Sequence, residues 1–155
     1  LSAFVLSLMS IDVQSLPSRF SEKLPRTFIA ILLFAIAAFL LLAWLGRIVP
    51  SLLTDAVPFG LESYSTLVIQ VLDLGLVVPL ALLSGILLLM GRPWGYLLTA
   101  VALVKGFTMG LAVTAMALAQ LIAGVEVAAF EVVVFPTLAL LLIIATILLL
   151  RSVED

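Results

Sequence analysis

Four apolar stretches, each about 20 residues long or longer, take up most of this 155-residue chain. They run over about 27–46, 63–90, 94–120 and 132–150. Apolar side chains make up 65% of the chain and charged ones only 10%, so the expected solvent is lipid rather than water. We therefore predict an all-α integral membrane protein, a bundle of four transmembrane helices that forms a single domain over residues 1–155.

The segments outside these stretches are short. Residues 1–15 are apolar enough for a helix but too few to cross a bilayer, which leaves two interpretations: an interfacial helix, or the end of a truncated fifth crossing. Residues 17–26 carry two prolines and three basic side chains and are predicted to be a linker. Residues 47–62 are rich in turn-forming residues and are predicted to be a loop after the first crossing.

The basic residues are unevenly divided between the two ends of the predicted spans. One end carries Arg19, Lys23, Arg26, Arg92 and Arg151, and the other carries Arg47. The basic end should face the cytoplasm, so the C-terminus is predicted to be cytoplasmic, and the small size fits a bacterial inner membrane. Trp44 and Tyr64 would mark the outer interface, and Trp94 and Tyr96 the inner one.

Polar residues in the second span follow one helix face. Glu62, Thr66, Gln70 and Asp73 are spaced by four, four and three residues, and this spacing aligns them along a helix. Asp73 would lie roughly 14 Å below Tyr64, near the middle of a hydrocarbon core about 30 Å thick. An unpartnered charge at that depth costs at least about 2.5 kcal/mol, so Asp73 should be protonated, hydrated or paired.

Lys105 in the third span is the expected partner of Asp73. The turn Gly91-Arg92-Pro93 makes the two spans antiparallel neighbours. Counted from that turn, Lys105 is roughly 17 Å and Asp73 roughly 26 Å deep, a difference of about 9 Å that a lysine stem covers in large part. The sequence thus predicts a buried salt bridge, direct or through water, with Thr108 in the same polar pocket.

A proline in the second span lies close to Asp73. Because Pro79 has no N–H, it leaves the carbonyl of Gly75 without its helical donor. The simpler interpretation is a kink that serves helix packing. The alternative is that the carbonyl and the Asp73 carboxylate together hold a proton, a cation or a water molecule.

Two further groups of residues invite a functional interpretation. Gly106 and Gly110 form a small-xxx-small pair that lets another helix approach closely, either from the same chain or from a second copy. Glu62, Glu126 and Glu131 form an outer acidic rim, which is either a solvated edge or a mouth that attracts cations.

The missing residue types exclude several classes of chemistry. The chain has no cysteine and no histidine, so we expect no disulfide, no cofactor and no metal site of the usual zinc, copper or haem kinds. Catalytic nucleophile–base sets and phosphate-binding loops are also missing from the sequence, which favours a protein that is not an enzyme. Its basic residues form no stripe for nucleic acid, and the expected partner is membrane lipid.

Two functional interpretations remain from different classes. The preferred one is a non-enzymatic structural or accessory subunit, in a homo-oligomer or a larger membrane complex, whose Asp73–Lys105 pair fixes helix packing. The alternative is a small transporter or binding module in which the polar stripe leads a proton, a cation or a small molecule to Asp73. An intramembrane enzyme, with Lys105 activated by the nearby carboxylate, is the least supported.

Overall fold

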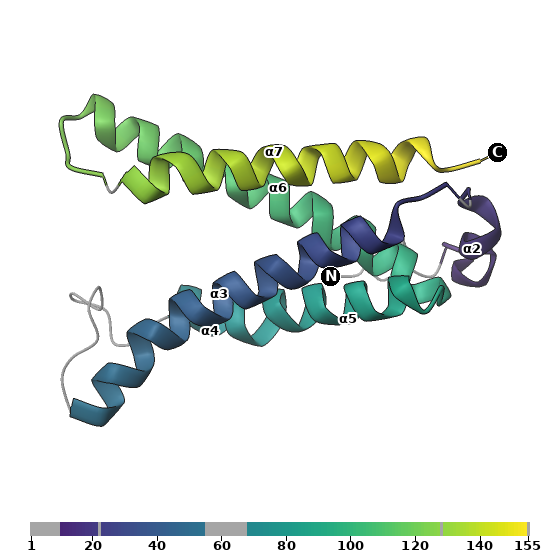
Figure 1. The fold of residues 1–155 in the computed structure, drawn as a ribbon, viewed down its shortest axis with the longest axis horizontal. Coiled ribbons are helices and arrows are strands. Elements are labelled where there is room, and N and C mark those ends of the chain that lie inside the picture. Colours follow the sequence, from purple (N-terminus) through teal and green to yellow (C-terminus); the bar gives the residue numbers. More distant parts are fainter. Residues whose placement is uncertain (1–9, 22, 55–67, 128, 155) are drawn as a thin grey trace.

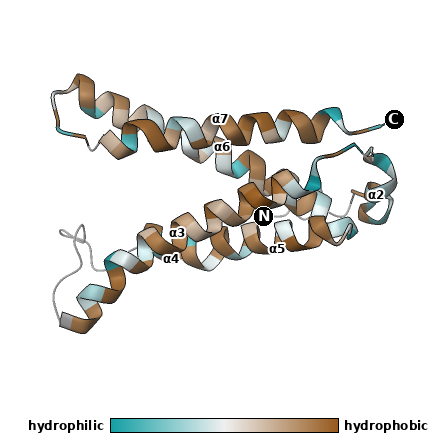
Figure 2. Cartoon of the chain, in the orientation of Figure 1, coloured by the Kyte–Doolittle hydropathy of each residue, from teal (hydrophilic) through white to brown (hydrophobic). Residues whose placement is uncertain are grey.

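The computed structural model describes residues 10–21, 23–54, 68–127 and 129–154, and nearly all of this part is helical. Its elements are η1 (Val13–Ser15), α2 (Leu16–Arg19), α3 (Arg26–Thr54), α4 (Val68–Leu72), η2 (Asp73–Val77), α5 (Val78–Leu89), α6 (Pro93–Ile122) and α7 (Ala129–Arg151). With α4, η2 and α5 forming one continuous rod, four helices are long and apolar enough to cross a membrane (Figure 2). The prediction of an all-α chain with four long apolar helices is confirmed.

The first long helix extends beyond its predicted end. The sequence suggested a loop from residue 47 onward, whereas α3 continues through Pro50 to Thr54. A proline in a helix removes one N–H and leaves a single carbonyl, here that of Gly46, without its donor. The apolar residues around Pro50 therefore stay helical, and the predicted loop was wrong over 47–54. Residues 55–67 lie outside the described part of the chain.

The segment before α3 also differs from the prediction. Residues 1–9 of the predicted N-terminal helix lie outside the described residues. The chain then forms the short turn η1 and the helix α2, so helical structure continues past residue 15 to Arg19. Pro17 is accommodated because it lies in the first turn of α2, where a backbone N–H has no helical acceptor.

Each long helix packs mainly against the long helix that precedes or follows it in the chain. α3 lies along α5, α5 along α6, and α6 along α7. Figure 1 shows α6 running diagonally from α5 to α7. Gly91 adopts φ of 65° in the turn between α5 and α6, and this left-handed conformation lets the chain reverse within three residues.

Small residues set how closely these helices approach. A Cβ at Gly95 would lie only 2.5 Å from the backbone nitrogen of Leu88, so the backbones of α5 and α6 touch there. Buried Ile29 and Leu33 of α3, with Leu103 of α6, fill the centre of the core. At the other end, the Phe39 ring lies 6.1 Å from that of Phe130 and 6.3 Å from that of Phe135, which joins α3 to the start of α7.

The segments that flank the four long helices meet at one end. The N–H of Ser21 donates to the carbonyl of Ser152, and the N–H of Glu154 donates to the carbonyl of Arg19, each at 2.7 Å. Tyr96, 1% exposed, stacks on Phe20 with ring centroids 4.8 Å apart. Tyr96 was expected at the inner interface. It lies at this end of the molecule, where the segment that contains Phe20 covers it.

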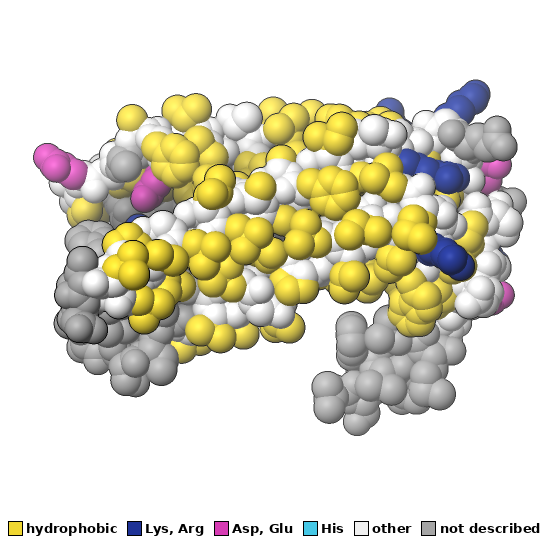
Figure 3. Space-filling view, turned by 60° about the horizontal axis from the view of Figure 1, so that its bottom comes forward, with side chains coloured by type: hydrophobic (Ala, Val, Ile, Leu, Met, Phe, Trp, Pro, Cys, Tyr) yellow, Lys and Arg dark blue, Asp and Glu magenta, His cyan; other side chains and the backbone are white. Residues whose placement is uncertain are grey.

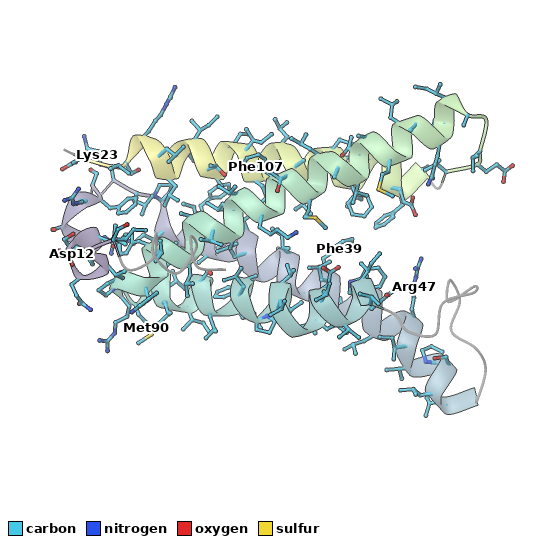
Figure 4. All side chains as sticks on the ribbon, turned by 180° about the vertical axis from the view of Figure 1, so that it is seen from behind. Asp12, Lys23, Phe39, Arg47, Met90 and Phe107 are labelled. Carbon is cyan, nitrogen blue, oxygen red and sulfur yellow. The ribbon has the colours of Figure 1, made fainter. Side chains whose placement is uncertain are left out.

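Charged side chains lie mainly at the two ends of the rod-like molecule. On the face shown in Figure 3, apolar side chains cover the middle, and Lys and Arg side chains gather mostly at one end. Figure 4 places Asp12, Lys23 and Met90 toward that end and Arg47 toward the other. This distribution agrees with helices whose middle parts lie in lipid.

Candidate functional site

Asp73 is bonded to a residue that the sequence analysis did not pair with it. The indole N–H of Trp44 on α3 donates to Oδ2 of Asp73 over 3.0 Å. Because α3 continues ten residues beyond Trp44, the indole lies roughly 15 Å inside the helix rather than at its end. That extension brings Trp44 level with the half-buried Asp73, and the hydrogen bond joins α3 to the second long helix.

The backbone at Asp73 is not an ordinary α-helix. Residues Asp73–Val77 form a π-helical turn, in which the N–H of Val78 donates to the carbonyl of Asp73. Pro79 follows one residue after this turn, as the second residue of α5, and has no N–H to offer to the carbonyls of the preceding turn. Gly75 is exposed, and no atom lies within 4 Å of the position that its Cβ would take. Such π turns occur frequently at functional sites.

A cation lies over the face of the Trp44 ring. The guanidinium of Arg47 is 5.6 Å from the centroid of that ring. Arg47 is three residues beyond Trp44, so the two side chains share one face of α3. Arg47, Trp44 and Asp73 thus form a layered cluster, which we call the Trp44 cluster, with a cation above the ring and a carboxylate at the indole edge.

The predicted salt bridge between Asp73 and Lys105 is not present. Lys105 is exposed on α6 and has no hydrogen bond or ion pair through its side chain with any residue that the structure describes. The reason is the course of α6, which leaves α5 after its first turns and packs on α7. Thr108 does not join a pocket either, because its hydroxyl donates to the carbonyls of Val104 and Lys105 in its own helix.

The pair of glycines in α6 lies against α7. A Cβ at Gly106 would be 3.1 Å from the Leu142 side chain, and one at Gly110 would be 3.0 Å from that of Ala139. Between the two alternatives left by the sequence, the structure has a helix of the same chain on this face. This contact is what draws α6, and Lys105 with it, away from Asp73.

The remaining predicted residues are spread apart or lie outside the described part. Gln70 is half-buried on α4, while Thr66 and Glu62 fall among the residues that the structure does not describe. Glu126 is exposed in the segment between α6 and α7. Glu131 is half-buried and lines a small hollow of about 150 Å³ with six other residues, namely Thr114, Ala117, Leu118, Leu121, Val132 and Pro136.

Most described hydroxyl groups of the long helices bond to their own backbones, while the buried Thr99 hydroxyl of α6 donates to the carbonyl of Ser84 on α5 over 3.5 Å. Ser84, Thr114, Thr137 and Thr146 each donate to the carbonyl four residues earlier. Within the described ranges, no group of three or more Asp, Glu, His or Cys side chains is placed to hold a metal ion. Among the described side chains, the Trp44 cluster is where charged groups take part in the contact between two long helices.

Comparison of the chain with protein-family models, with curated proteins and with solved structures found no match. The functional argument therefore depends on the geometry of this chain alone.

Proposed function

We propose that this protein is a non-enzymatic structural or accessory subunit of a homo-oligomer or a larger membrane complex. In this proposal its basic end and C-terminus lie in the cytoplasm of a bacterial cell. In this proposal the Trp44 cluster has the role that sequence analysis gave to a salt bridge with Lys105. Its hydrogen bond fixes the height of α3 against the second long helix. A directional bond of this kind sets helix register, which apolar contacts between lipid-embedded helices specify less sharply.

The observation that carries this proposal is the bond from Trp44 to Asp73. One oxygen of the only acidic side chain in the middle of the described spans accepts a hydrogen bond from a neighbouring helix. A carboxylate used in this way stabilises the packing of two helices. The hydroxyl groups of Ser84, Thr114 and Thr146 bond to backbone carbonyls of their own helices, and that of Thr99 bonds to the Ser84 carbonyl, which also supports a structural role over a catalytic one.

A double-mutant cycle tests the structural role of this bond. Trp44→Phe should lower the free energy of unfolding by about 1–3 kcal/mol, because it leaves a half-buried carboxylate without its donor. Asp73→Leu should also destabilise the protein. The combined variant should be less destabilised than the sum of the two, with a coupling of about 0.5–3 kcal/mol, as measured by reversible unfolding in mixed detergent micelles.

Asp73→Asn provides the matched control for the cycle. The asparagine side chain keeps a carbonyl oxygen that accepts from the Trp44 indole, so this variant should lose less stability than Asp73→Leu. If the two single changes are strictly additive, the bond does not fix the packing of α3, and the structural proposal is wrong.

A second candidate function is supported by the π turn. Asp73 begins the π turn, Pro79 has no N–H to offer to the carbonyls of that turn, and no atom lies within 4 Å of the Cβ position of Gly75. Oxygen ligands of this kind suit a proton, a cation or a water molecule. In this candidate function the protein is a small transporter or binding module, and Asp73 is its binding residue.

Native mass spectrometry on protein extracted gently from its own membrane separates the two candidates. The structural proposal expects reproducible association with other chains or with further copies, and no stoichiometric small ligand. A bound small ligand that disappears in Asp73→Asn would overturn it in favour of the binding module, because this variant retains the hydrogen bond to Trp44 but loses the charge.

A further inference from the structure

Lys105 is an exposed cation in the middle of a long apolar helix. It lies 12 residues after the start of α6 and 17 residues before its end. These separations correspond to roughly 18 Å and 26 Å of helix, more than a lysine stem spans, so the ammonium group cannot reach the headgroups on either side. A charge facing lipid at this depth is costly, and such residues pair with other polar groups.

The chain itself carries an acid at a matching depth. Asp73 differs from Lys105 in height by about 9 Å of helical rise, which the two side chains span together. Trp44 occupies only Oδ2, and Oδ1 of Asp73 has no donor among the described residues. Within one chain the two groups are kept apart, because α6 is drawn to α7 at Gly106 and Gly110.

We infer that a second copy of this chain covers the Lys105 face of α6, so that Lys105 of each copy pairs with Asp73 of the other. A two-fold axis along the membrane normal keeps equal residues of both copies at equal depth. It therefore brings each lysine close in height to the partner's carboxylate and forms two identical pairs. The inference rests on the proposed structural role, since it uses the oxygen that Trp44 leaves unoccupied.

The surroundings of both charges suit such an interface. On α6, Val101, Met109 and Met116 follow the same face as Lys105 and are 43%, 41% and 61% exposed. On the second long helix, Ile69 and Leu76 flank Asp73 on its face and are 63% and 64% exposed. The two methionines can adapt their shape to a neighbouring helix. Each charge is thus surrounded by apolar side chains that a second copy would cover.

Exchange of the charges gives a test with a defined rescue. Lys105→Asp makes both interacting positions acidic, and Asp73→Lys makes both basic, so each variant should form a much weaker homodimer than the unchanged protein. A mixture of the two should form heterodimers, because both contacts then join an acid to a base. The measurement is energy transfer between differently labelled copies in liposomes at a fixed protein-to-lipid ratio, compared with unchanged protein.

We expect each single variant to lose roughly tenfold or more in dimer affinity, and the mixture to recover most of it. Thr108→Val is the matched control, since Thr108 is also exposed on α6 but bonds its own backbone, and it should dimerise like the unchanged protein. Unchanged protein that stays monomeric, single variants that dimerise normally, or a mixture without recovery would each overturn the inference.

A second variant covers the case in which Asp73→Lys fails to fold. Lys105→Gln removes only the cation of an exposed side chain, so it should lower dimer affinity while the thermal unfolding of the monomer stays unchanged. Normal dimerisation of Lys105→Gln contradicts the inference. A failure of the structural proposal is distinguishable, since it is detected in the unfolding of the Trp44 and Asp73 variants and not in energy transfer.

Discussion

Replacing Gly95 with leucine is expected to prevent α5 and α6 from packing and to abolish the folded protein. A Cβ at this position would lie 2.5 Å from the nitrogen of Leu88 and 2.6 Å from the carbonyl oxygen of Leu87. These are backbone atoms, so no side-chain rotation relieves the clash. The loss should exceed the roughly 1–3 kcal/mol typical of overpacked cores, because two whole helices must separate. Size-exclusion profiles and thermal unfolding in mild detergent measure it.

Other glycines of the same chain provide graded controls. Gly85→Ala would press on the Phe34 ring at 2.5 Å, and because that side chain can move, the effect should be smaller than that of Gly95→Ala. Gly46 has no atom within 4 Å of its Cβ position, so Gly46→Ala should be neutral, or stabilising by up to about 1 kcal/mol. Equal tolerance of alanine at Gly95 and Gly46 would contradict the close approach of α5 and α6.

Tyr96→Ala should be the most damaging truncation of a side chain. Tyr96 is the largest fully buried residue in the described part of the chain, stacks on Phe20, and has the Arg26 guanidinium 5.4 Å from its ring centroid. Removal of a buried aromatic ring costs about 3–5 kcal/mol. It should also release the segment that contains Phe20, so trypsin should cleave after Arg19 and Lys23 faster than in the unchanged protein.

Tyr96→Phe is the control for this prediction. The phenylalanine ring keeps the stacking on Phe20 and the contact with Arg26, so stability and the rate of tryptic cleavage should stay close to those of the unchanged protein. If Tyr96→Ala unfolds at a lower temperature without faster cleavage, the ring supports the core but does not hold the N-terminal segment.

The arrangement of long apolar helices could be predicted because hydropathy identifies them directly. The predicted bounds of the last two spans lie within a few residues of those of α6 and α7, since Gly91-Arg92-Pro93 and Gly124 mark turns in the sequence. The end of α3 was misplaced, because Pro50 and Arg47 are typical of loops in a soluble segment. In a long helix a single proline costs one hydrogen bond, which the neighbouring turns tolerate.

The error at the end of α3 explains the error at the candidate site. With α3 ending near residue 46, Trp44 looked like an interfacial residue, far above Asp73. Once the helix continues to Thr54, the indole lies level with the carboxylate and supplies the donor that Asp73 needs. The sequence contained one usable signal, the indole N–H of Trp44 on the first span. A buried indole N–H usually finds a hydrogen-bond acceptor.

The course of α6 could not be predicted from depth alone. Asp73 and Lys105 were matched by their heights, but height says nothing of the direction in which a helix leans. That direction is set by how closely backbones approach, at Gly95 on one side and at Gly106 and Gly110 on the other. The glycines were recognised as packing residues, while their partner helix required the structure.

The backbone hydrogen bonds between residues 19–21 and residues 152–154 hold the two ends of the four-helix unit together. The segment before the first long helix and the segment after the last one are bonded to each other, so the four long helices begin and end at almost the same point. When the four helices cross a membrane, both flanking segments lie on the same side of it, whichever way the unit faces. A gene could therefore gain or lose the whole unit inside a longer membrane protein without changing which side its other segments occupy.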